Sequence, residues 1–256
     1  MTVAVSTTGT IPVPRSPLSG PAMPASSAAG CPPTNCRAVA YQRVLHQLVR
    51  RELRLLGELA TWAPAGEAER TATLSRHAEL VGRVLLHHHA VEREAVWPAL
   101  LRAVPADRTA GVRALIDDWT ARCAWIDHRL RDVSTAARQW QVTGVPHARD
   151  AFALACLDLA DAVDAHTAGE EAVLLPLLAE HLSGGDWAVI ARSSHCRLSG
   201  REQLLVLGLA MEDSCAADRA RLMSGLSPAM RLAWRLHGRQ DYRASVVRLR
   251  GAPPAV

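Results

Sequence analysis

Apolar residues recur at helical spacing along the chain from residue 38 onward. In the stretch 38–62, Val49, Leu53 and Leu56 follow one another at intervals of three or four residues, which places them on one face of a helix. The same period predicts helices over 67–103, 107–141, 147–182, 186–211 and 227–250. Asp107 and Asp186 are predicted N-caps, and Ser227 followed by Pro228 is typical of a helix start.

Short connections between these long amphipathic helices favour antiparallel neighbours. We therefore predict an all-α protein whose residues 37–183 form an up-down-up-down four-helix bundle. Residues 184–256 are predicted to form a C-terminal helical extension that either covers one end of the bundle or provides a face for a homodimer. Residues 1–36 are rich in Ser, Pro and Ala, which predicts a disordered tail.

Composition supports a helical core and a modest surface charge. Hydrophobic residues make up 49% of the chain, aromatic residues 4%, and the formal net charge is +4. Arginine groups such as RRELR, which begins at Arg50, are spread over several predicted helices. We interpret them as solvated helix faces and expect no nucleic-acid partner, because a binding stripe needs its arginines on one face.

The cysteines indicate a reducing compartment. There are 6 of them, scattered and without a C-x-x-C pair: Cys31, Cys36, Cys123, Cys156, Cys196 and Cys215. Free thiols, most of them buried, fit this pattern. No segment has the apolar length of a membrane span. We therefore expect a cytoplasmic protein with no membrane partner.

A duplicated motif carries the chemistry. HHAVEREAVWP (88–98) and HTAGEEAVLLP (166–176) both read H-x-x-x-E-x-x-x-x-x-P, and each follows another histidine, His46 or His128, by about forty residues. One such motif is a weak signal, and a lone core histidine is more often a packing residue than a ligand. Two copies in the same order indicate two helical hairpins of one pattern.

The spacing of the motif puts its polar residues on the core face. Residues four apart share one face of a helix. The side chains of His88 and Glu92 are therefore expected on the same face, as are those of His166 and Glu170. With His46 and His128, four histidines and two glutamates are predicted to converge inside the bundle. Burying two carboxylates without partners costs several kcal/mol each. Metal ions offset that cost, and a mixed imidazole–carboxylate set suits iron, manganese or zinc.

Other histidines receive lesser roles. His89 lies about 100° around the helix from His88, so we expect it, like Glu171, to support the ligands or lie at the surface rather than bind metal. His77 shares the core stripe but is too far along it for the same metal. The H-x-x-x-D sequence at 237–241 is single, and we take it as chance.

The chain resembles the hemerythrin-like, or HHE cation-binding, family over about residues 38–182. LHQLVRREL (45–53), DHRL (127–130) and the two H-x-x-x-E motifs match the four segments of that family in order. The resemblance implies a non-haem di-iron centre, with an oxo or hydroxo bridge, that binds or reacts with dioxygen or its reduction products. Position by position, it implies that His46 and His88 bind one iron, His128 and His166 bind the other, and Glu92 and Glu170 bridge the two.

Two departures affect the expected centre. Classical oxygen carriers of this family have a fifth histidine four residues after the one on the third helix, and here that position is Asp132. Asp132 is either a carboxylate ligand or a solvent-exposed residue. Arg93 stands where the family often has an acidic residue, so a hydrogen bond to the ligands is missing or replaced. Ferritin-like proteins use E-x-x-H instead, which points away from their chemistry.

Three functions remain open at this stage. The protein could bind or sense dioxygen or iron; it could be an oxidase, oxygenase or peroxidase acting with dioxygen or peroxide, including on a small-molecule substrate; or it could be a bundle holding zinc or no metal. An aspartate in place of the fifth histidine leaves a more open or more anionic centre, which favours oxidative chemistry. Binding and catalysis stay nearly equal.

Overall fold

The computed structural model describes residues 36–64, 66–194, 197–252 and 254. The predicted disordered tail lies outside this range except for Cys36. The described residues contain helices and no strand. The elements of the first part are α1 (Arg37–Thr61), α2 (Ala68–Val91), the π-helical segment η1 (Glu92–Val96), α3 (Trp97–Ala103), α4 (Ala106–Thr143) and α5 (Pro146–His181).

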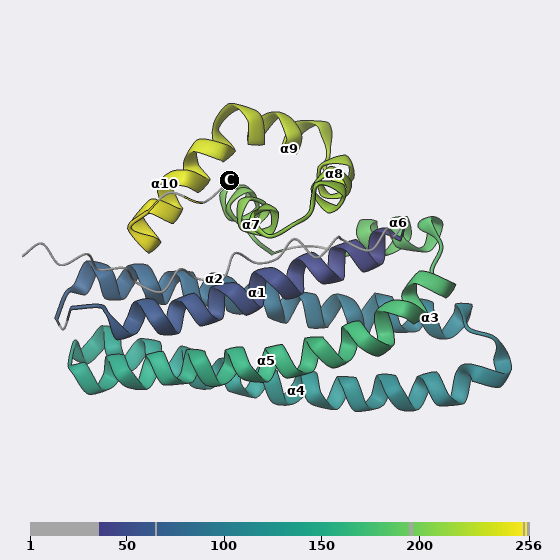
Figure 1. The fold of residues 1–256 in the computed structure, drawn as a ribbon, viewed down its shortest axis with the longest axis horizontal. Helices are drawn as coiled ribbons and strands as arrows, with labels where there is room; N and C mark the ends of the chain where they lie inside the picture. Colours follow the sequence, from purple (N-terminus) through teal and green to yellow (C-terminus); the bar gives the residue numbers. More distant parts are fainter. Residues whose placement is uncertain (1–35, 65, 195–196, 253, 255–256) are drawn as a thin grey trace, which may run out of the picture. The chain divides into compact units, whose positions relative to one another are not determined.

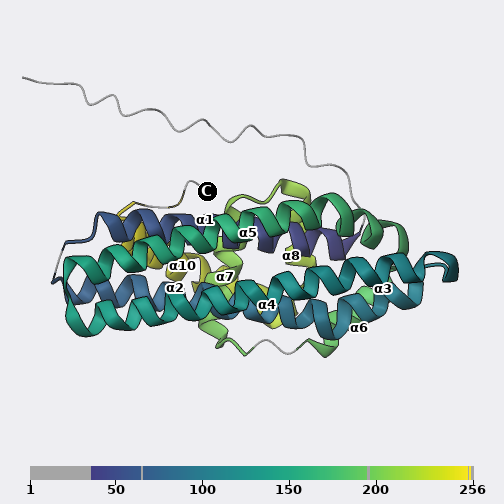
Figure 2. The same ribbon diagram turned by 90° about the horizontal axis from the view of Figure 1, so that it is seen from below.

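The long helices α1, α2, α4 and α5 lie side by side in a four-helix bundle (Figures 1 and 2). Each contacts two neighbours: α1 and α4 each pack against both α2 and α5. The connections α1–α2 and α4–α5 are short, so consecutive helices run in opposite directions. This confirms the predicted all-α bundle with up-down-up-down topology.

The C-terminal part contains more helices than the periodicity predicted. They are α6 (Gly184–Ser193), α7 (Gly200–Glu212), α8 (Ala216–Gly225), α9 (Pro228–Ala233), the π-helical segment η2 (Trp234–Gly238) and α10 (Arg239–Arg250). The single helix predicted over 186–211 is thus two helices, because Ser199 caps a new one in a capping box with Glu202. Ser227 caps α9 as predicted.

Two of the predicted N-caps are wrong by a few residues. Pro105 occupies the N-cap position of α4, and Asp107 lies in its first turn. At α6, Ser183 is the N-cap, and Asp186 is its partner three residues later in a capping box. Both aspartates still lie at helix N-termini, where a negative charge stabilises the helix.

The helix predicted over 67–103 is continuous but widens in the middle. The π-helical turn η1 begins at Glu92, three residues after His89, and Pro98 follows its last residue by two positions. Proline lacks the N–H of a normal helical bond and crowds the preceding turn, which accounts for a wide turn at this place. Such π-turns are frequent at functional sites.

The core of the bundle consists of two apolar clusters. The first includes Leu48, Leu53, Val81, Leu130, Trp140, Phe152 and Leu159. The second includes Val39, Val91, Trp97, Ile116, Trp119, Leu174 and Leu178.

A layer of buried polar residues lies between the two clusters. On α5, His166 and Glu170 come after Val163 of the first cluster and before Leu174 of the second. Buried polar or sulfur-bearing residues separate the clusters in the same way on α2 and α4. The bundle therefore encloses a polar layer with apolar packing on both sides.

The C-terminal helices cover the side of the bundle formed by α1 and α2, not one of its ends. Helices α7 and α8 contact α1, and α10 contacts α2 (Figure 1). Arg43 pairs with Asp218 at 3.1 Å, and an Arg51 Nη atom donates to the Leu209 carbonyl at 2.8 Å. The interpretation of the RRELR group as a solvated face is therefore wrong for Arg51, which connects the bundle to the extension.

The centre of this junction is a buried carboxylate, Glu52, which is 0% exposed. Its Oε1 accepts hydrogen bonds from Arg51 at 2.8 Å and from Arg250 at 2.7 Å. Its Oε2 lies 2.7 Å from Nε2 of His77. Burial alone would raise the pKa of Glu52, but the bond to His77 and the charges of His77 and the two arginines lower it to about 2. His77 thus partners Glu52 and, as expected, lies apart from the metal-ligand candidates.

Replacing Glu52 should weaken the fold. Glu52→Gln leaves His77 without its anion and removes one of the two carboxylates that Arg250 contacts, so we expect a loss of about 3 kcal/mol in the free energy of unfolding at neutral pH. Because the folded-state pKa lies below the ordinary value, the carboxylate stabilises the protein above about pH 4.5 and loses this effect as the pH falls toward 2. Denaturant titrations from pH 7 to pH 3 measure both effects.

Glu58→Gln is the matched control, because Glu58 is exposed on the same helix. It should leave the free energy of unfolding within about 0.5 kcal/mol of the parent. Equal stability of the two variants at pH 7 would show that Glu52 does not stabilise the junction.

Candidate metal centre

Four of the predicted ligands form one buried group in the polar layer. They are His46 on α1, His88 on α2, Glu92 on η1 and Glu170 on α5. One potential ligand atom of each lies within 4.8 Å of those of the others, and every residue is at most 2% exposed. Nε2 of His46 lies 3.4 Å from Glu170 Oε2, and Nε2 of His88 lies 3.2 Å from Glu92 Oε1. We call this set the first group.

A second group combines His89, Cys123 and His166. Its potential ligand atoms also lie within 4.8 Å of one another, and its members are at most 5% exposed. Sγ of Cys123 is 3.5 Å from Nε2 of His166. His89, expected to support the ligands or face solvent, is instead buried with them.

Glu170 connects the two groups. Its Oε2 is 3.4 Å from His46 Nε2 in the first group and 3.8 Å from His166 Nε2 in the second. The imidazole rings of His88 and His89, one from each group, have centroids 5.9 Å apart. The groups therefore adjoin, with a carboxylate between them.

Side chains around the groups hold the imidazoles in place. Nδ1 of His46 lies 2.9 Å from Glu171 Oε1, which Arg50 Nη2 also contacts at 3.1 Å. Nδ1 of His89 lies 2.7 Å from Asp127 Oδ1. A carboxylate on the far nitrogen of an imidazole is the usual support of a metal-binding histidine. The contact of Glu171 is the kind that the sequence analysis expected for it.

The side-chain amide of Gln42 supports the carboxylate of Glu92. Gln42 Nε2 donates to Glu92 Oε1 at 2.7 Å, while Arg93, which replaces the acidic residue frequent in relatives, is exposed. The hydrogen bond expected to be missing or replaced is therefore supplied from α1.

The two buried glutamates differ in charge. Burial and the nearby charge of Glu170 raise the pKa of Glu92 well above its ordinary value. Burial opposes ionisation of Glu170 as well, but the imidazole of His46, whose Nε2 lies 3.4 Å from Glu170 Oε2, lowers the pKa of Glu170 to about 2. The surroundings thus favour the anionic form of Glu170 and disfavour that of Glu92.

The histidines divide in a similar way. Burial lowers the pKa of His46, but the nearby carboxylates of Glu170 and Glu171 outweigh it and raise the pKa. Burial, aided by the charge of His46, lowers the pKa of His88 well below its ordinary value. Burial also lowers the pKa of His166 to about 4. His88 and His166 are therefore neutral at pH 7, which is the form that binds metal.

The donor set fits metal ions, because many of its buried atoms lack a hydrogen-bond partner. Among the described residues, these atoms are Nε2 of His46, Nδ1 of His88, Oε2 of Glu92, Nδ1 of His166 and both carboxylate oxygens of Glu170. Buried polar atoms in proteins are normally paired. So many unpaired atoms in one layer indicate that bonding partners are absent from it, and three imidazoles with two carboxylates suit divalent transition metals.

The structure does not bring His128 and Asp132 to these groups. Both side chains are exposed on α4, so the prediction that His128 converges with the other ligands is wrong, and the exposed alternative holds for Asp132. The buried stripe of α4 runs through Trp119, Cys123 and Ile126. His128 lies about 160° around the helix from Ile126 at 100° per residue, on the opposite face.

The sequence analysis missed three residues of the site: Gln42, Cys123 and Asp127. The spacing of buried positions on α4 could have shown Cys123, since Trp119, Cys123, Ile126 and Leu130 recur every three or four residues. The DHRL match drew attention to His128 instead. No comparable pattern marks Gln42 or Asp127.

Two features lie between the groups and solvent. The rings of Trp187 on α6 and Tyr41 have centroids 5.1 Å apart, and Tyr41 is 6.2 Å from His88, so aromatic side chains cover the first group. On the side of the second group, a groove of about 380 Å³ between α2 and α4 has Asp127 in its wall. This groove reaches the carboxylate that contacts His89.

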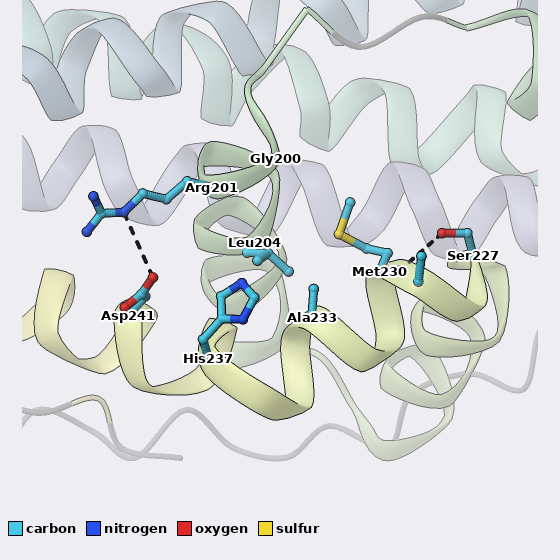
Figure 3. Close-up of a pocket in the computed structure, with 9 residues that line it drawn as sticks. Gly200, Arg201, Leu204, Ser227, Met230, Ala233, His237 and Asp241 are labelled. Atoms are coloured by element: carbon cyan, nitrogen blue, oxygen red, sulfur yellow. Dashed lines mark hydrogen bonds and ion pairs between the residues drawn. The ribbon is translucent and has the colours of Figure 1, made fainter.

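The C-terminal helices form a separate cleft of about 540 Å³ (Figure 3). His237 and Asp241 both line it, but Asp241 pairs with Arg201 at 3.9 Å, and the His237 ring lies near Leu204 and Ala233 (Figure 3). A single histidine with a neutralised aspartate is a poor metal site. This agrees with the interpretation of H-x-x-x-D at 237–241 as chance.

A search of the helices in the described part of the chain found none that combines the length and hydropathy needed to cross a membrane.

The model of the hemerythrin HHE cation binding domain family matches residues 37–178 of the chain. Comparisons with curated proteins and with solved structures gave no match. The matched range covers α1 to α5 almost entirely and contains every residue of both groups. The chain therefore belongs to the family of hemerythrin HHE cation-binding domains and is a metal-binding protein.

Proposed function

We propose that the protein holds two iron ions in the polar layer and uses them to bind or activate dioxygen or peroxide. The observation that carries this proposal is the adjacency of the two buried groups, which Glu170 joins. Several donor atoms of these groups lack a hydrogen-bond partner among the described residues. Together with the family match, this adjacency favours a dinuclear centre over a single zinc site.

The residues of the first group would hold one ion through His46 and His88, and His166 would hold the other. Glu92 and Glu170 lie where carboxylates would be shared between the two. Bound iron supplies the electrons with which dioxygen or peroxide reacts. The chain supplies neutral imidazoles, anionic charge from Glu170, and Glu171 and Gln42 as supports that fix the orientation of the ligands.

Burial of the site favours a small reactant. All seven residues of the two groups are at most 5% exposed, so an organic substrate would have to part the helices to touch them. Dioxygen or peroxide is small enough to pass from the α2–α4 groove beside Asp127. The geometry therefore supports binding or reduction of a small oxidant better than oxidation of a larger substrate.

Iron content tests the dinuclear centre. After aerobic expression with added iron, elemental analysis should find about two iron atoms per chain. His88→Ala and Glu170→Gln should each lower the content to about one or less, because each removes a donor that the ion needs. His237→Ala is the control, since His237 lies in the separate cleft, and it should keep both ions. One zinc and no iron in the parent protein would refute the proposal.

Reaction with oxidant tests the activity itself. Reduced, iron-loaded protein mixed with dioxygen or hydrogen peroxide in a stopped-flow spectrometer should change its visible absorption. Glu170→Gln should slow or abolish the change. Reversal on removal of dioxygen would indicate binding, whereas an irreversible change with consumption of the oxidant would indicate activation. No spectral change with either oxidant contradicts the proposed function.

A further inference from the structure

We propose that Cys123 binds the second metal ion as a thiolate, in a set completed by His89 and His166. This inference rests on the proposed dinuclear centre and assigns the ligands of its second position. It departs from the all-histidine and carboxylate set that the sequence implied for that ion.

The position of Cys123 along α4 is the first argument. It follows Trp119 of the second apolar cluster and precedes Ile126 of the first, so it is the residue of α4 at the level of the polar layer. Its side chain is 4% exposed, and its sulfur lies 3.5 Å from His166 Nε2. His128 lies more than one turn further along and is exposed.

The neighbours of Cys123 are the second argument. Nδ1 of His166 is buried without a hydrogen-bond partner among the described residues. His89 contacts Asp127 through Nδ1 at 2.7 Å, which leaves the lone pair of Nε2 for a metal. His46 and Glu171 form the same carboxylate–imidazole pair in the first group. Each group thus has one histidine oriented by a carboxylate outside it.

Another buried thiol shows the difference. Cys156 is 0% exposed and belongs to the first apolar cluster, where it packs as a small apolar residue. Cys123 is instead grouped with two imidazoles, outside both clusters. The two cysteines therefore provide a site and a control within one chain.

Binding involves a simple exchange. The Cys123 thiol loses its proton to solvent, and the sulfur lone pair forms the bond to the metal. A thiolate with two imidazoles selects iron or zinc over magnesium or manganese. The two metal positions would therefore differ: nitrogen and oxygen donors surround the first, and a sulfur donor joins them only at the second.

Cobalt serves as the probe. Full-length protein is stripped with a chelator, titrated with Co²⁺ and followed by near-ultraviolet absorption, where sulfur-to-cobalt charge transfer appears. The parent protein should bind about two cobalt ions per chain and show this band. Cys123→Ser should lose the band and weaken the second ion by about tenfold or more. Cys156→Ser and His128→Ala should keep the band and both ions.

Two further measurements do not depend on folding of the Cys123 variant. X-ray absorption of the zinc-loaded parent should show a sulfur neighbour at about 2.3 Å. Asp127→Asn should weaken the second ion by about 10- to 100-fold while the sulfur band persists at saturating cobalt, because Asp127 orients His89 and does not touch the sulfur.

The outcomes separate this inference from the proposed function. Two cobalt ions without a sulfur band, or loss of an ion in His128→Ala, overturns the assignment of Cys123 and leaves the dinuclear centre standing. If the cobalt form shows the sulfur band but the iron-loaded protein does not react with dioxygen or peroxide, the assignment of Cys123 is supported and the proposed function is overturned.

Discussion

The fold depends on burying ionisable groups in the middle of an apolar bundle. His46, His88, Glu92 and Glu170 are each at most 2% exposed, with apolar clusters on both sides. Charges in such surroundings destabilise a protein unless they are paired or bound to metal. The internal pairing is incomplete, because burial and the charge of Glu170 raise the pKa of Glu92, and Glu170 is balanced mainly by His46. The layer is therefore built for a ligand that the chain itself does not provide, and metal binding and stability are coupled in it.

This constraint also explains the surroundings of the layer. Carboxylates of Glu171 and Asp127 hold one histidine of each group, and Gln42 holds Glu92. Arg50 in turn neutralises Glu171 at the bundle surface. Negative charge is thus placed outside the imidazoles, where it strengthens them as donors. The π-helical turn that begins at Glu92 belongs to the same region, about one turn after two adjacent buried histidines.

The bundle and half of the site could be predicted from the sequence because they follow from local periodicity. Residues four apart on one helix, such as His88 with Glu92, must share a face whatever the rest of the fold. The failure at His128 has the opposite cause: its role depends on the rotation of α4 about its axis, which apolar spacing determines and a short motif does not. Contacts between distant helices, such as Gln42 with Glu92, depend on packing that no local pattern contains.

The ion cluster at Glu52 has a consequence for how the chain matures. Arg250, which follows Glu52 by 198 residues, is the last residue of α10 and donates to the carboxylate of Glu52. During synthesis the four bundle helices leave the ribosome well before α10 does. Until then Glu52 has His77 and Arg51 as partners, and the flank of α1 and α2 is without its cover. The last turn of α10 thus completes the first helix hairpin, and native assembly has to wait until α10 has left the ribosome, at the cost of closing a very long loop.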